Sequence, residues 1–180
     1  MKHLGGHGNR TWTDEGALKY IQNKFSISSM VDVGCGTAGM RSIAEALDIK
    51  WLGIDGDPNV SQNGVITHDF TKGEVETDKF DLGWSVEFLE HVYEEYQPNY
   101  MAVFAKCKYV LCTAAPPGWG GYHHVNEHPR EYWIDVFSKY GFVYDEKITN
   151  EVKKNSTMKK KKGKSFMRRN GMFFRNTNIE

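Results

Sequence analysis

The chain is organised around Val31-Asp-Val-Gly-Cys-Gly-Thr-Ala-Gly39, an apolar run that leads directly into a glycine-rich turn. A short apolar run bounded by glycine predicts a buried strand, and the residues after the turn predict a helix. Gly34 and Gly36 allow positive φ angles, and Gly39 allows close strand–helix packing, so that a ligand can lie on the main chain. The free N–H groups at the start of the helix would then face that ligand.

Asp32 separates this turn from an ordinary dinucleotide site. A carboxylate within an apolar strand is costly to bury without partners, and a second anion beside a phosphate-binding turn is unfavourable. A ligand that carries an ammonium and a sulfonium group suits it better. With Asp32, the stretch resembles motif I of the class I S-adenosylmethionine-dependent methyltransferases, which reads apolar-Asp-apolar-Gly-Cys-Gly-x-Gly; Gly39 comes one position later than in the commonest version. The small type 11 and type 23 methyltransferase-domain families are the ones that the chain resembles.

Two further acids follow predicted strands. Asp55 comes after the apolar run 50–54, about twenty residues beyond the turn, where an acid accepts hydrogen bonds from both ribose hydroxyls of dinucleotides and S-adenosyl ligands alike. Asp69 and Phe70 close a short predicted strand over 65–68. The resemblance implies that Asp69 binds the adenine amino group and that Phe70 lies against the adenine ring, although a lone Asp at a strand end is also a common turn former.

A second match extends from Phe80 to Val92 and reads Phe-Asp-Leu-Gly-Trp-Ser-Val-Glu-Phe-Leu-Glu-His-Val. It is similar to the methyltransferase series Phe-Asp-apolar-apolar-x-Ser-x-Glu-x-apolar-Glu-His-apolar and is not expected in nicotinamide-dependent enzymes. It implies that Ser85, Val86 and Glu87 lie at the carboxyl end of the fourth strand, where α/β sheets bind ligands. The predicted cofactor-binding residues are therefore Asp32, Gly34, Cys35, Gly36, Asp55, Gly56, Asp69, Phe70, Ser85, Val86 and Glu87.

The candidate catalytic residues are His124, His123 and His91. The first two lie in the irregular, aromatic stretch 114–126, which follows the fifth predicted strand. An oxygen or nitrogen acceptor must lose a proton on methylation, and histidine is a natural base near neutral pH. Structural hydrogen bonds by these histidines are the alternative. With His128 they could suggest zinc, but a fourth ligand and a cysteine pair are lacking, so the sequence favours no metal.

The predicted fold class is α/β, a three-layer Rossmann-like methyltransferase fold with a seven-stranded, mostly parallel sheet and an antiparallel last strand. Residues 1–180 are expected to form a single domain. We expect a first helix capped by Thr13, a sixth strand over 142–148 and a last strand over 171–175 beside it. A helix before the first strand covers the ligand site in this family, so His7, Trp12 and Tyr20 border the site or serve only in packing.

The charge pattern has one unusual segment. Lysines plus arginines and aspartates plus glutamates number 23 each, so overall charge indicates no particular partner. Residues 153–169 contain seven lysines, two arginines and no acid, which predicts a solvated, mobile insertion that could attract nucleic acid. Against DNA base methylation, Ala114-Ala-Pro-Pro-Gly-Trp119 lacks the polar residue and the adjacent aromatic of amino-methylating enzymes, and no Pro-Cys pair is present.

Three widely spaced cysteines indicate reduced thiols, and no apolar run approaches membrane-spanning length, which favours a cytoplasmic protein. The sequence therefore predicts transfer of a methyl group from S-adenosylmethionine, with S-adenosylhomocysteine as product, to an oxygen or nitrogen of a small molecule. Alternatives are an RNA or protein methyltransferase that uses the lysine-rich segment, a noncatalytic nucleic-acid-binding protein on the same fold, and a nicotinamide-dependent oxidoreductase. Nothing in the sequence predicts the oligomeric state.

Overall fold

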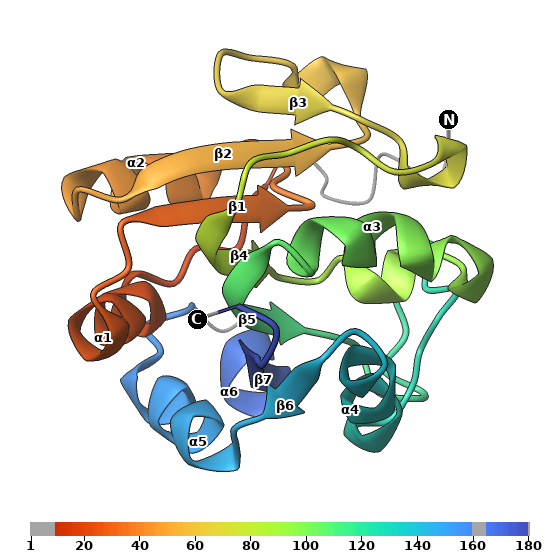
Figure 1. Cartoon of the computed structure of the whole chain (residues 1–180). Helices are drawn as coiled ribbons and strands as arrows, with labels where there is room; N and C mark the ends of the chain where they lie inside the picture. Colours follow the sequence, from red (N-terminus) through yellow and green to blue (C-terminus); the bar gives the residue numbers. More distant parts are fainter. Residues whose placement is uncertain (1–9, 160–164, 180) are drawn as a thin grey trace.

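A seven-stranded sheet forms the centre of the molecule in this computed structural model, which describes residues 10–159 and 165–179 (Figure 1). The strand order is β3-β2-β1-β4-β5-β7-β6. Strands β1 to β5 are parallel, whereas β7 runs antiparallel to both of its neighbours, β5 and β6. The predicted sheet is confirmed. The strands are β1 (Ser29–Val33), β2 (Lys50–Asp55), β3 (Val65–Thr67), β4 (Phe80–Ser85), β5 (Cys107–Thr113), β6 (Phe142–Tyr144) and β7 (Gly171–Asn176).

Helices cover both faces of the sheet. One face packs against α3 (Gln97–Phe104) and α4 (Arg130–Ser138), and the other packs against α1 (Glu15–Phe25), α2 (Gly39–Ala46), α5 (Glu146–Asn155) and α6 (Phe166–Asn170). Short 3-10 turns lie near the carboxyl edge of the sheet and are η1 (Pro58–Val60), η2 (Phe70–Lys72), η3 (Leu89–His91) and η4 (Glu94–Tyr96).

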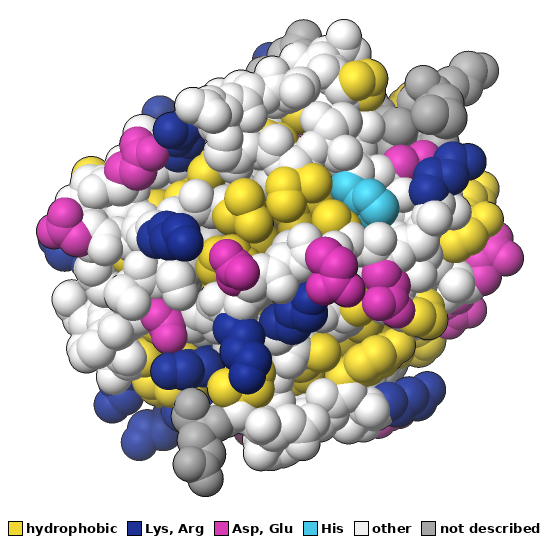
Figure 2. Space-filling model, turned by 45° about the horizontal axis from the view of Figure 1, so that its top comes forward, with side chains coloured by type: hydrophobic (Ala, Val, Ile, Leu, Met, Phe, Trp, Pro, Cys, Tyr) yellow, Lys and Arg dark blue, Asp and Glu magenta, His cyan; other side chains and the backbone are white. Residues whose placement is uncertain are grey.

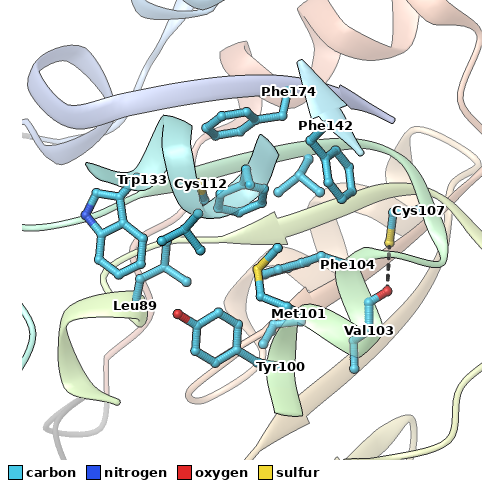
Figure 3. Close-up of a cluster of buried hydrophobic side chains, with 14 of the residues drawn as sticks. Leu89, Tyr100, Met101, Val103, Phe104, Cys107, Cys112, Trp133, Phe142 and Phe174 are labelled. Atoms are coloured by element: carbon cyan, nitrogen blue, oxygen red, sulfur yellow. Dashed lines mark hydrogen bonds between the residues drawn. The ribbon is translucent and has the colours of Figure 1, made fainter. Parts of the chain in front are cut away.

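The central strands are mostly apolar because both of their faces are buried. In β5, Val110 and Cys112 join the core under α3 and α4, while Leu111 joins the core on the opposite face. Figure 3 shows the core under α3 and α4, in which aromatic side chains of these two helices pack against the sheet. The rings of Phe137 and Phe174 stack with their centroids 4.2 Å apart. Two such layers fix the sheet and hence the positions of its strand ends.

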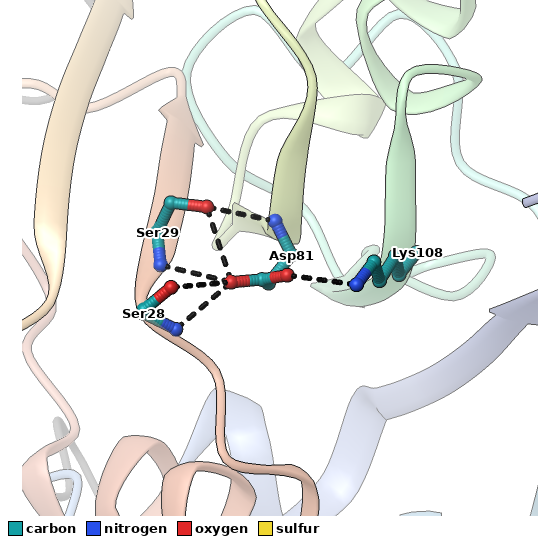
Figure 4. Close-up of polar contacts among 4 residues, drawn as sticks. All are labelled: Ser28, Ser29, Asp81 and Lys108. Atoms are coloured by element: carbon teal, nitrogen blue, oxygen red, sulfur yellow. Dashed lines mark hydrogen bonds and ion pairs between the residues drawn. The ribbon is translucent and has the colours of Figure 1, made fainter. Parts of the chain in front are cut away.

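A polar cluster holds the amino ends of three strands together (Figure 4). One oxygen of Asp81 accepts hydrogen bonds from the backbone and hydroxyl groups of both Ser28 and Ser29, at 2.9 to 3.2 Å. The other oxygen pairs with the Lys108 ammonium group at 3.4 Å. Burial alone would raise the pKa of Asp81, but the Ser28 and Lys108 contacts outweigh it and hold that pKa below its ordinary value.

The first helix is tied to a distant part of the chain through its cap. Asp14, not Thr13 as predicted, is the N-cap, and its carboxylate accepts a hydrogen bond from the Ala17 N–H at 3.1 Å. The same buried carboxylate accepts bonds from the Ser156 hydroxyl and, at 2.8 Å, from the Thr157 N–H. Asp14 is thereby joined to two residues that lie 142 and 143 positions later in the chain.

The predicted sixth strand over 142–148 is too long. β6 ends at Tyr144, because the Asp145 side chain accepts a hydrogen bond from the Ile148 N–H at 2.9 Å and so starts α5. Ile148 and Val152, four residues apart, are buried on one face of this helix. The spacing of these two residues is helical rather than alternating.

The prediction of a solvated insertion over 153–169 is wrong for part of the residues that the structure describes, and its mobility stays a prediction; residues 160–164 lie outside the described residues. Residues 153–155 complete α5, and Phe166 begins α6. Met158, Phe166 and Met167 are buried in the core. The Arg168 guanidinium donates to the Ser156 carbonyl oxygen, with the shorter contact at 2.6 Å. Apolar residues spaced among the lysines anchor the segment against the sheet.

Within 10–159 and 165–179, no helix combines the length and the apolar character that crossing a lipid bilayer requires. Cys35, Cys107 and Cys112 are buried free thiols, as the sequence predicts.

Candidate functional site

A cavity of about 820 Å³ lies at the carboxyl edge of the parallel strands. The turns after β1 to β4, the loop after β5 and the segment before α1 form its walls. The structure brings together here all of the sequence-predicted site residues except Ser85, namely Asp32, Gly34, Cys35, Gly36, Asp55, Gly56, Asp69, Phe70, Val86, Glu87, His91, His123 and His124.

Ser85 does not line the cavity. Its side chain is fully buried, and its hydroxyl donates to the Val33 carbonyl oxygen at 2.9 Å. The motif serine therefore joins the ends of β4 and β1, and its predicted cofactor contact is not supported by the position of its side chain.

The glycine turn is held by the main chain of the neighbouring strand. The N–H groups of Gly34 and Cys35 both donate to the Ile54 carbonyl oxygen, at 2.8 and 3.2 Å. Gly34 has a φ of 77°, and a Cβ atom there would lie 2.6 Å from the Phe88 ring. Only glycine satisfies this backbone angle and this close approach without displacement. The turn therefore leaves its backbone exposed along the cavity wall.

Asp55 ties the glycine turn to the end of β2. Its carboxylate accepts a hydrogen bond from the Gly36 N–H at 2.8 Å through one oxygen and from the Asp57 N–H at 2.9 Å through the other. The side chain is buried but borders the cavity. Because each carboxylate oxygen has two lone pairs, both can accept a further bond from a ligand.

Asp32 lies one position before the end of β1, beneath the glycine turn. Its residue is 3 % exposed, and one carboxylate oxygen, Oδ2, has no hydrogen-bond partner among the residues that the structure describes. Burial, reinforced by the Asp55 carboxylate and opposed by a contact with the Trp51 side chain, raises the pKa of Asp32 to about 8. A buried acid in this state, placed on the wall of a cavity, is poorly satisfied and would be stabilised by a cationic group.

Asp69 and Phe70 follow β3. The Asp69 carboxylate accepts bonds from the Thr71 N–H at 2.9 Å and from the Thr71 hydroxyl at 2.8 Å, so it caps the short turn η2. This is the turn-forming role that the sequence left open. Phe70 is buried, and its ring meets the Phe88 ring edge to face with 5.7 Å between centroids. Both residues nevertheless line the cavity.

Glu87 follows β4 and has a strained backbone, with a φ of 55°. The buried Thr113 side chain holds this conformation, since its hydroxyl accepts from the Glu87 N–H at 2.9 Å and lies 3.2 Å from the Glu87 carboxylate, to which it donates. Strain that the surroundings enforce is common at binding sites. Val86 and Glu87 line the cavity on either side of this bend.

Histidines and glutamates gather at another part of the cavity wall. The His124 Nδ1 atom lies 2.7 Å from Glu127 Oε1, and the His91 Nδ1 atom lies 3.2 Å from the His123 carbonyl oxygen. The rings of His91 and His124 meet edge to face at 4.9 Å. The Gly120 and Gly118 N–H groups each donate to Glu127 at 2.8 Å. Two imidazoles are thus oriented side by side.

The electrostatics of this cluster are unusual. Burial, helped by His124, lowers the pKa of His91 to about 4, so its imidazole is neutral at pH 7. Burial opposes ionisation of Glu127, but the His124 and glycine N–H contacts outweigh it and lower the pKa of Glu127. Glu90 is fully buried, and burial together with the Glu87 carboxylate raises the pKa of Glu90 well above its ordinary value.

Sequence reasoning missed Glu127 and Thr11. Glu127 follows His124 by three residues, a spacing that could have drawn attention to it. Ala38 is the N-cap residue of α2 and has no side-chain oxygen, so Thr11 caps this helix instead. The Thr11 hydroxyl oxygen accepts from the Gly39 N–H at 3.3 Å, and the hydroxyl donates to the Cys35 carbonyl oxygen at 3.2 Å. Of the predicted border residues, Trp12 lines the cavity, Tyr20 does not, and His7 lies outside the described residues.

Comparison with known proteins gives relatives by structure only. No model of a known protein family matches the chain, and no curated protein matches it significantly. A TehB-like SAM-dependent methyltransferase from Corynebacterium glutamicum is 14% identical over 90% of this chain and 88% of its own, with a TM-score of 0.64.

Two further solved structures are similar. The magnesium protoporphyrin IX methyltransferase from Synechocystis PCC 6803, solved with bound SAM, is 12% identical over 88% of this chain and 74% of its own, with a TM-score of 0.59. The plantazolicin methyltransferase BpumL, solved in complex with SAH, is 13% identical over 90% and 82%, with a TM-score of 0.58. The sheet order, the antiparallel β7 and these superpositions agree, and the chain therefore has the three-layer Rossmann-like fold of the class I S-adenosylmethionine-dependent methyltransferases.

Proposed function

We propose that this protein is an S-adenosylmethionine-dependent methyltransferase whose cofactor binds against the glycine turn after β1. The observation that carries this proposal is the buried Asp32 carboxylate, which lies on the cavity wall with one oxygen unpartnered among the described residues. A cationic ligand stabilises the ionised form of this group, whereas the phosphates of a dinucleotide offer it no compensating positive charge. Asp32 therefore favours a sulfonium ligand over a nicotinamide cofactor.

The residues around the turn fit the parts of that cofactor. Asp32 would bind its ammonium group, and the backbone at Gly34, Cys35 and Gly36 would lie along its chain. Asp55 would accept bonds from the ribose hydroxyls. Asp69 and Phe70 would contact the adenine, and the remaining contacts would come from Gly56, Val86 and Glu87. When bound, S-adenosylmethionine supplies an electrophilic methyl group and leaves as S-adenosylhomocysteine.

The acceptor is proposed to be an oxygen or nitrogen atom of a small molecule. The loop after β5 and the histidine cluster close the same cavity, so an acceptor held there would be screened from water. Two similar structures are named as methyltransferases of a porphyrin and of plantazolicin, which favours a small-molecule acceptor. The acceptor proton must go to a group of this chain or to water, and His124, oriented by Glu127, is the histidine best placed to accept it, ahead of His123 and His91.

An RNA or protein acceptor, or nucleic-acid binding without catalysis, would use the basic segment around 153–169. Much of the described part of that segment is packed against the fold, and acidic and basic side chains are interspersed on the face shown in Figure 2. These observations favour the small-molecule proposal. Polynucleotide binding that falls steeply with salt and ignores mutation of Asp55 would support the noncatalytic alternative instead. The three free thiols support the predicted cytoplasmic location.

Calorimetric titration with S-adenosylhomocysteine, S-adenosylmethionine and NAD tests the proposal directly. We expect both S-adenosyl ligands to bind and NAD to give no heat. Asp55→Ala should weaken S-adenosyl binding about 10-fold or more, since bonds to a charged group contribute about 1.5–3 kcal/mol each. Asp135→Asn, on the exposed face of α4, is the matched control and should bind normally. Unchanged affinity in Asp55→Ala, or tight NAD binding, would contradict the assignment.

A further inference from the structure

Glu90 is a buried acid that its surroundings leave unsatisfied. The residue is 0 % exposed, and neither carboxylate oxygen makes a hydrogen bond of good geometry within the described part of the chain. The backbone N–H groups of Glu90 itself and of Ala115 offset only part of the effect of burial on the pKa of Glu90. Its backbone is firmly placed, because its carbonyl oxygen accepts from the N–H groups of Val125 and Asn126 at 2.9 and 3.1 Å. A carboxylate fixed in this way with few donors is costly to ionise unless a cation approaches it.

Two imidazoles lie beside Glu90, and each has one ring nitrogen held by a hydrogen-bond acceptor. His91 Nδ1 faces the His123 carbonyl oxygen, which can only accept, so this contact assigns the proton to Nδ1 and the lone pair to Nε2. His124 Nδ1 faces the Glu127 carboxylate and is protonated for the same reason. Metal-binding histidines are typically oriented by such a bond from the other ring nitrogen to a carbonyl or carboxylate oxygen.

A glycine packs closely against the His124 ring. A Cβ atom on Gly121 would lie 2.1 Å from His124 Nε2 and 2.5 and 2.7 Å from the ring carbons Cδ2 and Cε1, so only glycine fits here without displacing this imidazole. His128, which the sequence grouped with the other histidines, takes no part: it stacks on Tyr132 at 3.7 Å and lies 3.6 Å from Glu94.

We propose that Glu90, His91 and His124 form a binding site for one divalent first-row transition-metal ion, with Glu127 and the His123 carbonyl oxygen orienting the two imidazoles. One ligand atom from each of the three residues lies within 4.8 Å of the other two. Around zinc, bonds of about 2.0–2.2 Å place neighbouring ligand atoms about 3.3–3.5 Å apart, so modest side-chain movement closes the site. Two imidazoles with one carboxylate favour zinc, iron, cobalt or manganese over magnesium and calcium.

The ion would face the cavity, which His91 and His124 both line. If the proposed function is correct, the ion would act as a Lewis acid toward an acceptor oxygen, which favours a hydroxyl over an amine as the methylated group. His124 would then be a metal ligand rather than a general base. Metal binding itself does not depend on the proposed function.

The test is titration of the full chain, freed of metal with a chelator, with cobalt(II) chloride in the absence of any S-adenosyl ligand. We expect one equivalent to bind with visible d–d absorption bands, and one equivalent of zinc to abolish those bands. Glu90→Gln and His124→Ala should each weaken cobalt binding more than about 100-fold, and Glu127→Gln about 10- to 100-fold. His128→Ala is the control and should bind as the wild type does.

Circular dichroism of each variant under the same conditions establishes that it is folded. The proposal is overturned if folded wild-type protein gives no cobalt spectrum, if Glu90→Gln and His124→Ala bind cobalt normally, or if His128→Ala loses binding equally. Titration of the metal-free wild type with S-adenosylhomocysteine separates the two proposals, because cofactor binding there tests the methyltransferase assignment alone.

Discussion

Replacing Asp32 with Asn should make the ligand-free protein more stable and its ligand binding weaker. Burial raises the pKa of this carboxyl to about 8 from the ordinary value of 3.8. Keeping it protonated at pH 7, where the unfolded chain would release the proton, therefore costs at most about 4 kcal/mol of folding free energy. The amide that replaces it is also buried and costs about 1–3 kcal/mol if unsatisfied, so the expected net gain is about 1–3 kcal/mol.

The pH dependence has a definite sign. An acid whose pKa is raised on folding binds a proton in the folded state that the unfolded state lacks, so stability falls as pH rises from about 4 to about 8. Asp32→Asn lacks this dependence, and the gap between variant and wild type should widen from pH 5 to pH 8. For a chain of this length, about 1–3 kcal/mol corresponds to about 2–12 °C in melting temperature.

Differential scanning calorimetry at pH 5, 6, 7 and 8, with and without S-adenosylhomocysteine, measures both effects. The variant should melt higher than the wild type without ligand and should show a smaller increase with it, because the partner of the ligand's ammonium group is gone. A variant that melts at or below the wild-type temperature at pH 8, or that keeps the full ligand-induced increase, would refute the role assigned to Asp32.

Three further substitutions test other parts of the structure. Gly34→Ala should cost about 2–4 kcal/mol in urea unfolding, because its φ is 77° and its Cβ would lie 2.6 Å from the Phe88 ring; unfolding like the wild type would contradict the packing of the turn. Asp81→Asn should lower stability by about 1 kcal/mol at pH 7. The difference should vanish as pH falls below about 4, because the carboxyl then becomes protonated first in the unfolded state and, at lower pH, in the folded state too. A pH-independent difference would argue against this. Ser156→Ala should cost about 1–3 kcal/mol in the same urea assay by removing a donor to the buried Asp14, and no loss would mean that the contact is dispensable.

The sequence was informative where the backbone constrains residue type. The glycine turn, the acid that ends β2 and the mostly apolar β4 could be predicted because a positive φ, a close approach and a strand buried on both faces each restrict the residues at fixed positions. The histidine cluster is different. Glu127 is oriented by the N–H groups of Gly118 and Gly120, and the path of an irregular loop cannot be derived from periodicity.

Composition misled the prediction near the end of the chain. A segment rich in lysine and free of acids reads as solvated, yet Met158, Phe166 and Met167 attach it to the core. The missed helix α5 has a similar cause. From the sequence alone, Asp145 is equally compatible with a strand, and only the hydrogen bond that its side chain accepts from the Ile148 N–H identifies it as a helix cap. In both places, a few tertiary or capping contacts outweigh the average character of the segment.

The cap of α1 has a consequence for synthesis of the chain. Two of the donors to Asp14, Ser156 and Thr157, are translated more than 140 positions after it. Until they emerge from the ribosome, the Asp14 carboxylate stays hydrated and the contacts that hold α1 are incomplete. A nascent chain released shortly before residue 156 would therefore lack both of these donors, and the cap of α1 would be incomplete.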